Sequence, residues 1–410
     1  MKYQRPCSVA LFAFVCLALS TSAASSERTL HAFRGTPDGA TPFVRVIADA
    51  SGNLYGSTVL GGKFGDGCIF ELRPSANGGW HESILYNFSG PDGSSPDGSL
   101  VFDTAGNLYG TTAGGGTHGG GVVFELSPTS SGPWTETILH NFGNGTDSTD
   151  GYDPQAEMVF DSAGNLFGTT QFGGTGSGFE NGGTVFRLSP SADGWNYSQL
   201  YSFPGSYSGP DGNLPAGGLA IDQSGNLFGV AQAGGANGSG AVYELSPVGD
   251  GTYTEKIIFS FNGNNGRLPN STPVFDSAGN LYGTTETGGA PCSCGTVYRL
   301  THHANDTWSE TVLFAFDGND GWEIVGPPVF DSAGNLYAAS TAGGINAKGL
   351  VFELIPSTAG HWTERILHDF RGTSDGAAPY AGVIIDSAGH LFGTTSGGLV
   401  NNGTVFEIIP

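Results

Sequence analysis

The chain has 410 residues, of which 70 are Gly and 22 are Pro, and its formal net charge is -23. Glycine at more than twice its usual share of roughly 7% disfavours a helical protein, because each Gly costs about 1 kcal/mol inside a helix. A hydrophobic share of 38% is enough to bury a core, which excludes a disordered chain. The acidic balance excludes nucleic acid as a partner, since phosphate binding needs a basic surface.

Residues 1–24 have the pattern of a cleaved secretory signal peptide. Lys2 and Arg5 supply a positive start, an apolar run of eleven residues follows, and small residues come next. The run is too short to span a bilayer comfortably, and no later stretch is apolar enough to do so. A lipoprotein alternative at Cys16 is disfavoured by the bulky Val15 before it. We expect export to the periplasm or the extracellular space, with a mature net charge of -23 - 2 = -25.

The remaining residues, 25–410, repeat one unit seven times. The unit is marked by an Asp that recurs every 54 to 61 residues and is followed three residues later by Gly. Six copies then have Asn, and His390 takes its place in the seventh. The seven marker residues are Asp49, Asp103, Asp161, Asp222, Asp276, Asp331 and Asp386. Asp, Gly and Asn in this order are typical of a tight turn, so the marker indicates a structural role.

Each unit has four runs of β-branched and aromatic residues, which we call strands a to d. In the second copy they cover 100–102, 107–112, 122–126 and 134–142. Gly, Asn, Asp, Ser and Pro separate the runs, and no stretch carries helical periodicity over three turns. Units of about 55 residues with four strands each predict the blades of a β-propeller.

The two ends of the chain predict how the propeller closes. The last unit stops after its third strand, at 405–408, and an extra strand d at 27–33 precedes the first unit. In both 27–33 and 136–142, Glu lies six residues before Phe. We expect strand 27–33 to complete the C-terminal blade, because a closed ring leaves no exposed strand edges. The predicted fold is therefore all-β, a seven-bladed β-propeller with four antiparallel strands per blade.

Strand d carries three repeated aromatic positions. Its last residue is expected to pack between blades and is Phe33, Phe88, Phe142, Phe203, Phe261, Phe316 or Phe370. The aromatic residues that open it are expected to cover blade edges, with sugar stacking as the alternative, and are Trp80, Trp134, Trp195, Tyr253, Trp308 and Trp362. His31, His140 and His368 share a third position that Tyr or Phe fills elsewhere, which indicates packing and not catalysis.

The connection from strand d to the next strand a has the pattern Asp/Asn-Gly-x-x-Pro, which is turn chemistry. Its acidic members are Asp38, Asp92, Asp150, Asp211, Asp320 and Asp375, with Asn265 in the fifth copy and no Pro after Asp320. In a propeller these connections approach the axis and share one face with the b-to-c loops, and fold analogy makes that face the expected ligand face. The variable b-to-c loops add His118, Glu180 and Lys348 to the six Asp as candidate ligand contacts.

Metal binding is a second possible use of the acidic loops. A ring of Asp forms either a set of solvated turn carboxylates or a negative funnel that attracts a cation. The loops densest in acid contain Asp147, Asp150, Asp153 and Glu157, and Asp317, Asp320 and Glu323. Neither loop has the spacing of an EF-hand. Ca²⁺ binding at these loops remains an alternative, and we expect no other cofactor. Three Cys lie outside the leader, Cys68, Cys292 and Cys294, and the last two fit a small local disulfide.

No catalytic motif fits the predicted architecture. P-loop and His-Glu-x-x-His patterns are absent. Gly-x-Ser-x-Gly at 372–376 falls in a d-to-a turn instead of between a strand and a helix. Paired carboxylates for glycoside cleavage stay an alternative, because side chains from different blades can meet without any fixed sequence spacing. His118 together with Asp150 or Glu180 is the set that would indicate an enzyme.

Three segments, 159–170, 173–174 and 183–186, resemble the repeats of the GloVer tandem-repeat family of exported bacterial proteins, whose C-terminal anchors vary between members. They consist of Val-Phe-Asp-Ser-Ala-Gly-Asn-Leu-Phe-Gly-Thr-Thr, Gly-Gly and Gly-Thr-Val-Phe. The resemblance covers 27–410 and implies an exported repeat protein, but it carries no activity, and no anchor is recognisable here. NHL-type propeller repeats are similar more weakly, and the catalytic residues of lyase and lactonase propellers have no matching motif.

Together these observations favour an exported, monomeric propeller that serves as a binding or interaction module for extracellular carbohydrate or protein. The ligand is expected on the face formed by the Asp-Gly turns and the Gly-rich loops. The first alternative is a hydrolase or lyase, lactonase-like or polysaccharide-active, with its site in the central pocket. The second alternative is a structural role in the cell envelope.

Overall fold

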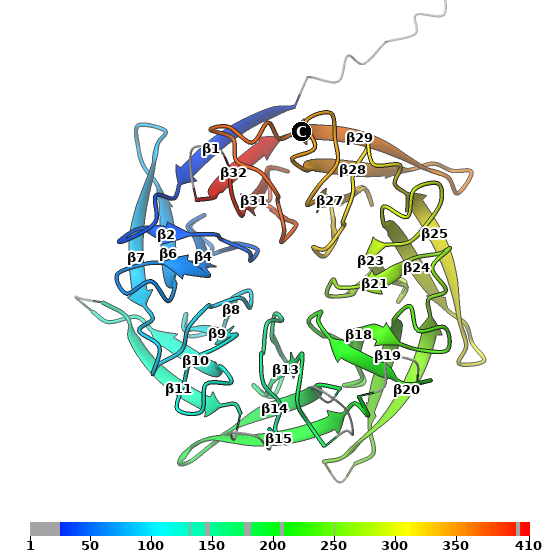
Figure 1. Cartoon of the computed structure of the whole chain (residues 1–410), viewed down its shortest axis with the longest axis horizontal. Helices are drawn as coiled ribbons and strands as arrows, with labels where there is room; N and C mark the ends of the chain where they lie inside the picture. Colours follow the sequence, from blue (N-terminus) through cyan, green and yellow to red (C-terminus); the bar gives the residue numbers. More distant parts are fainter. Residues whose placement is uncertain are drawn as a thin grey trace, which may run out of the picture.

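The computed structural model describes residues 25–130, 133–143, 148–175, 182–205, 209–249, 251–398 and 402–410. Within these ranges the secondary structure consists of β-strands, and no helix there is long and apolar enough to cross a membrane. Seven four-stranded antiparallel blades surround a central axis (Figure 1). The predicted all-β, seven-bladed propeller is confirmed.

The strands of each blade follow the order a, b, c, d from the axis to the rim (Figure 1). Blades one and two contain β3 (Ile47–Ala48), β4 (Leu54–Thr58), β6 (Cys68–Pro74) and β7 (Trp80–Asn87), then β8 (Val101–Phe102), β9 (Leu108–Thr112), β10 (Val122–Ser127) and β11 (Thr135–Asn141). Blades three and four contain β12 (Val159–Phe160), β13 (Leu166–Thr170), β14 (Thr184–Ser191) and β15 (Gly194–Ser202), then β17 (Ala220–Ile221), β18 (Leu227–Gly234), β19 (Ala241–Pro247) and β20 (Tyr253–Ser260).

Blades five to seven repeat the same order. Blades five and six contain β22 (Val274–Phe275), β23 (Leu281–Thr287), β24 (Thr296–His302) and β25 (Trp308–Ala315), then β26 (Val329–Phe330), β27 (Leu336–Ser340), β28 (Leu350–Pro356) and β29 (Trp362–Asp369). Blade seven contains β30 (Val383–Ile385), β31 (Leu391–Thr395), β32 (Thr404–Ile409) and β1 (Ser26–Ala32). Four short strands lie on the connections and loops, β2 (Gly39–Ala40), β5 (Leu60–Gly61), β16 (Gly212–Pro215) and β21 (Arg267–Pro269).

The N-terminal strand β1 closes the ring. It pairs antiparallel with β32, from Ser26 opposite Ile409 to Ala32 opposite Thr404. Phe33 follows β1, is fully buried, and meets the ring of Phe70 in blade one edge to face with centroids 5.1 Å apart. The predicted closure is confirmed, with the strand starting one residue earlier than expected.

The predicted inter-blade packing of the strand-d Phe residues is also confirmed. Each of the seven is fully buried and contacts an aromatic ring on strand c of the next blade, with centroids 5.0 to 5.2 Å apart. Trp134, which opens strand d of blade two, lies against Tyr55 of the preceding blade, as expected for a residue that covers a blade edge. Aromatic pairs of this geometry add about 0.5–1.5 kcal/mol each to the gain from burial.

The Asp-x-x-Gly-Asn segments form the turns between strands a and b. In blade six, Oδ1 of Asp331 accepts hydrogen bonds from the N–H groups of Ala333 and Asn335 at 2.8 and 2.9 Å. Its Oδ2 accepts from Nδ2 of Asn335 at 2.8 Å and from the hydroxyl of Tyr337 at 3.1 Å. Gly334 has a φ of 86°, which favours glycine. The structural role expected for the seven marker Asp is confirmed.

The d-to-a connections contain a feature that the turn pattern does not predict. The residue before the Pro, or before Ile324 in the sixth copy, is left-handed with φ between 54° and 61° in Thr41, Ser95, Asp153, Leu214, Leu268, Glu323 and Ala378. The N–H of Ala378 donates to the carbonyl of Lys348 in the preceding blade at 2.9 Å, and its carbonyl accepts from the N–H of Ser396 at 3.0 Å. The connection therefore joins two blades and fixes the segment that follows it.

Candidate functional site

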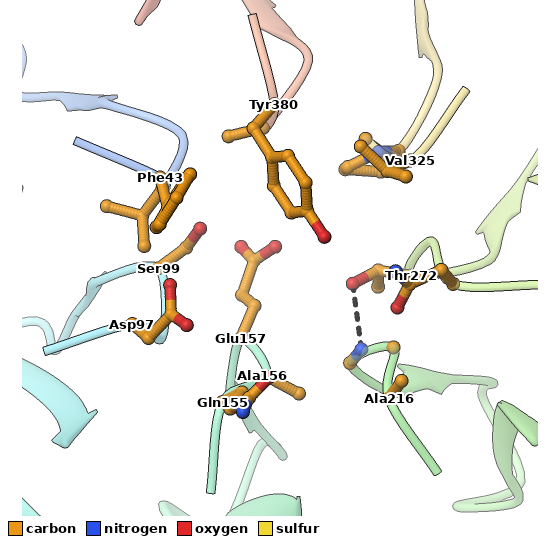
Figure 2. Close-up of a pocket in the computed structure, with 17 residues that line it drawn as sticks. Phe43, Asp97, Ser99, Gln155, Ala156, Glu157, Ala216, Thr272, Val325 and Tyr380 are labelled. Atoms are coloured by element: carbon orange, nitrogen blue, oxygen red, sulfur yellow. Dashed lines mark hydrogen bonds between the residues drawn. The ribbon is translucent and has the colours of Figure 1, made fainter. Parts of the chain in front are cut away.

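A cavity of about 210 Å³ lies on the axis, where the d-to-a connections reach strand a (Figure 2). Its walls come from all seven blades, one short segment from each, directly after the connector Pro or its equivalent. In the blade-two segment the middle residue, Gly98, has little space, since a Cβ there would meet Oγ1 of Thr111 at 2.1 Å. Side chains alternate along an extended chain, so we attribute the lining mainly to the residues on either side. These are Phe43, Asp97, Ser99, Gln155, Glu157, Ala216, Gly218, Asn270, Thr272, Val325, Pro327 and Tyr380.

An ion pair connects two of these segments. Nη2 of Arg45, from blade one, lies 2.8 Å from both Oε1 and Oε2 of Glu157, from blade three. Both side chains are about four-fifths buried. The carboxylate of Glu157 points toward the middle of the cavity (Figure 2). The pair therefore places a fixed, charged acceptor at the axis.

Asp97 is a second carboxyl group in the cavity wall (Figure 2). Burial and, to a lesser extent, the nearby carboxylate of Asp153 together raise its pKa to about 7. Near neutral pH both its protonated and its ionised form are populated, so the group can donate as well as accept a hydrogen bond.

Two aromatic rings form one side of the cavity. Phe43 and Tyr380 have centroids 5.1 Å apart, and the Tyr380 hydroxyl points into the space between the segments (Figure 2). Burial, together with the carboxyl groups of Glu286, Asp97 and Glu323, raises the pKa of Tyr380 to about 12. The carboxyl groups around this ring give the site a negative potential, which disfavours anionic ligands.

Neutral polar groups complete the wall. Nε2 of Gln155 donates to Oδ2 of Asp153 at 2.9 Å, and Oγ1 of Thr272 accepts from the N–H of Gly218 at 3.0 Å (Figure 2). Asn270 lines the cavity in the segment that contains Thr272. The cavity has room for several waters or for one small polar ring. Rings, amides, hydroxyls and carboxyls together suit a polyhydroxylated, uncharged ligand.

The profile of the Gloeobacter/Verrucomicrobia repeat matches residues 17–223 and 216–410. The chain belongs to this repeat family. The resemblance seen in segment 159–170 is thereby confirmed. No curated protein matches the chain in sequence.

Solved structures similar to this repeat protein share little sequence with it. A protein from Lactobacillus plantarum is 13% identical with a TM-score of 0.54, and the match covers 87% of this chain and 99% of that one. PorZ, a surface component of the type-IX secretion system of Porphyromonas gingivalis, is 17% identical with a TM-score of 0.46, and the match covers 85% of this chain and 44% of that one. The likeness to the Lactobacillus plantarum protein supports the fold alone.

The d-to-a connections lie beside the end of strand b and the loop that follows it. β2 pairs with β5, and β16 and β21 pair with the C-terminal ends of β18 and β23. The turn Asp residues, however, contact strand d near the rim. Tyr86 donates to Asp92 at 2.7 Å, and Nε2 of His31, His140 and His368 lies 3.4, 3.0 and 3.4 Å from Asp38, Asp150 and Asp375. The segment after the Pro, and not the Asp-Gly pair, reaches the axis.

The other predicted ligand contacts are dispersed. Asp320 accepts from the N–H of Asp317 at 2.7 Å, and the carbonyl of Asp211 accepts from the N–H of Gly235 at 2.8 Å. His118 and Lys348 are exposed on their loops, and Glu180 lies outside the described residues. Within the described residues, Asp150 contacts His140, whose Nε2 lies 3.0 Å from Oδ2 of Asp150. As ligand contacts, these residues stay predictions.

The axial residues were largely missed at the sequence level, although Glu157 was noted in an acidic loop. Phe43, Asp97, Asn270 and Tyr380 occupy the same register in four copies, directly after the Pro, and no two are alike. The Pro before each of them is the same in all four copies. A residue that packs in every blade is expected to be of one type in every copy. The variation at the position after the Pro is therefore the sequence signal that identifies the axial residues.

Proposed function

We propose that this repeat protein is a binding module that holds one neutral sugar residue of a glycan in the axial cavity. The observation that carries the proposal is the convergence of different polar side chains and two rings from seven otherwise similar blades on one small cavity. A sugar ring offers an apolar C–H face to Phe43 and Tyr380, and its hydroxyls match the carboxyls of Asp97 and Glu157 and the amide of Asn270. The site is preformed by the ring of blades, which lowers the entropic cost of binding.

Binding to an array of neutral glycans, followed by titration calorimetry of each hit, tests the proposal. We expect Tyr380→Ala and Asn270→Ala to weaken binding at least tenfold, since each removes a contact in the cavity wall. Trp322→Ala is the matched control, because Trp322 is 46% exposed and lies on the same face in a d-to-a connection. Loss of binding in the Trp322 variant alone would place the ligand on the open face and contradict the axial site.

A hydrolase acting in the same cavity is the second candidate, and one observation favours it. The carboxyl group of Asp97 has its pKa raised to about 7, while Glu157 is ion-paired to Arg45. Asp97 would then act as the general acid, and the ion-paired Glu157 would be the charged carboxylate beside it. Asp97→Asn would then abolish turnover of a bound glycan and leave its affinity within a few-fold of the parent. A glycan that binds and is not cleaved supports the binding module.

We also propose that the protein is exported and that residues 1–24 are removed. The basic start, the apolar run and the small residues after it support this proposal. N-terminal sequencing of the protein recovered from the periplasm and the medium tests it, and an intact Met1 would contradict it. Light scattering on the same material tests the predicted monomer.

A further inference from the structure

Five of the seven blade interfaces share a pair of acidic side chains near the rim. In each pair, the Glu of strand d in one blade lies near the connector Asp that follows strand d of the preceding blade, whereas Tyr197 and Asn265 interrupt the pattern at the other two interfaces. In blade two, burial and Asp92 raise the pKa of Glu136 to about 7, and in blade four burial and Asp211 do the same for Glu255. Oε1 of both Glu residues is enclosed without a hydrogen-bond partner. Such a pair needs a proton or a cation to compensate its burial.

At the interface between blades seven and one, an imidazole joins the two carboxyl groups at a spacing that suits one ion; His368, Asp375 and Glu27 form a related group between blades six and seven. One ligand atom each from His31, Asp38 and Glu82 lies within 4.8 Å of the other two. His31 is on β1, Asp38 on the connection after it, and Glu82 on β7. The titratable groups that act on Glu82 are Asp38, His31 and His81, and none of these is a Lys or an Arg. Oε1 of Glu82 is enclosed and has no hydrogen-bond partner.

The carboxylate of Asp38 is held in place by the backbone. Its Oδ1 accepts from the N–H of Gly39 at 2.9 Å, and its Oδ2 accepts from the N–H of Arg34 at 3.0 Å. The side chains of His31 and Asp38 keep 21% and 17% of their surface exposed, so an ion can reach them from solvent. The backbone therefore orients the Asp38 carboxylate, and the His31 and Asp38 side chains stay accessible to an ion from solvent.

We propose that His31, Asp38 and Glu82 bind a divalent transition-metal ion, for which Zn²⁺ is the best match, and that the ion fastens the closing strand β1 to blade one. One imidazole nitrogen and two carboxylate oxygens are accepted Zn²⁺ donors, and three protein ligands leave a position for water. The ion takes the place of the proton that the other acidic pairs need. Because it joins residues on β1 and β7, it stabilises the folded ring. The proposal is independent of the glycan site.

Other interfaces of the same molecule supply the matched control. His140 occupies the strand-d position of His31 and lies 3.0 Å from Asp150, but Tyr197 stands where Glu82 would be, and its hydroxyl donates to the carbonyl of Asp150 at 2.7 Å. Phe259 fills the same position in blade four, so His31→Phe introduces a residue that the repeat already tolerates.

The test is Zn²⁺ titration calorimetry on the tag-free, EDTA-treated full chain, with Co²⁺ absorption as a second readout and Tm as a third. We expect His31→Phe and Glu82→Gln to bind one equivalent fewer than the parent and to lose the Zn²⁺-dependent rise in Tm. His140→Phe is expected to bind as the parent does. Equal stoichiometry in the parent and the His31 variant, no saturable Zn²⁺ binding by the parent, or binding of Ca²⁺ that ignores His31 would each overturn the proposal.

Discussion

At the scale of single residues, the repeated Asp residues have two separate roles. The marker Asp residues hold the a-to-b turns through several hydrogen bonds each, whereas four of the six connector Asp residues contact strand d. Asp331 shows the first role, because its carboxylate accepts from two backbone N–H groups, one amide and one hydroxyl. The marker carboxylate thus accepts hydrogen bonds from backbone N–H groups of its own turn.

Asp331→Ala removes these acceptors and leaves the N–H groups of Ala333 and Asn335 without their side-chain partner, whereas the Tyr337 hydroxyl keeps Oε1 of Glu353 at 2.9 Å. We expect the free energy of unfolding to fall by about 1.5–3 kcal/mol, the range for hydrogen bonds to a charged group. The hydrogen bonds lower the pKa of Asp331, so this stabilisation is present above the ordinary Asp pKa and is lost as the pH falls through the lowered value. Urea unfolding at pH 7 measures the cost, and glycan binding by the folded variant is expected to be unchanged.

Glu364 shows the opposite shift. Burial and the carboxylates of Asp320 and Asp317 raise its pKa to about 8. The folded protein therefore keeps the proton at pH values where the unfolded chain has lost it, and stability falls as the pH rises from the ordinary Glu pKa toward 8.

Glu364→Gln is expected to remove part of this dependence. Its Tm should match that of the parent at pH 5 and exceed it by a few degrees at pH 8, because Gln stays neutral at both. Differential scanning calorimetry at the two pH values measures this. Glu244→Gln, on β19, controls for the loss of one charge, and an equal gain at pH 8 from both variants would show that net charge, and not the interface, is responsible.

At the scale of elements, the strands and turns could be predicted because they recur. Seven copies of one pattern identify each strand and turn, and the Glu to Phe spacing in 27–33 identifies the closing strand. The axial site could not be predicted in the same way. Tyr380 and Asp97 come from blades seven and two, and only the closed ring brings them into one cavity. The left-handed connector residues were missed because they include Leu, Thr and Glu, which do not indicate that conformation.

The connector geometry can be tested at Ala378, whose φ is 55°. A left-handed residue other than Gly costs about 1–2 kcal/mol, and Gly loses about 0.5–1 kcal/mol of that gain through its freer unfolded state. We expect Ala378→Gly to be neutral or to stabilise by up to about 1 kcal/mol. Ala378→Val is expected to destabilise by more than about 1 kcal/mol, since a β-branched side chain disfavours this region. Urea unfolding of both variants measures the difference, and equal stability would contradict the assigned conformation.

At the scale of the whole molecule, closure gives the interface between blades seven and one the same aromatic packing as the six others. Phe33 meets Phe70 across that interface with the same geometry that Phe142 adopts against Phe186, at 5.1 and 5.2 Å between centroids. Both Phe33 and Phe142 are fully buried. The packing therefore predicts that β1 is as stable in its blade as an internal strand d. The alternative is that β1, at the end of the chain, detaches before the rest of the ring unfolds.

Comparison of Phe33→Ala with Phe142→Ala tests whether β1 detaches more easily than an internal strand d. Removing a fully buried Phe costs about 3–5 kcal/mol, because the transfer energy is lost and a cavity remains. If β1 is held as firmly as β11, both variants lose the same free energy of unfolding in urea, followed by Trp fluorescence. If β1 detaches first, Phe33→Ala shifts the global transition little and instead raises hydrogen exchange in β32, the strand that β1 covers. We expect the two losses to agree within about 1 kcal/mol, since the contacts around the two rings are alike.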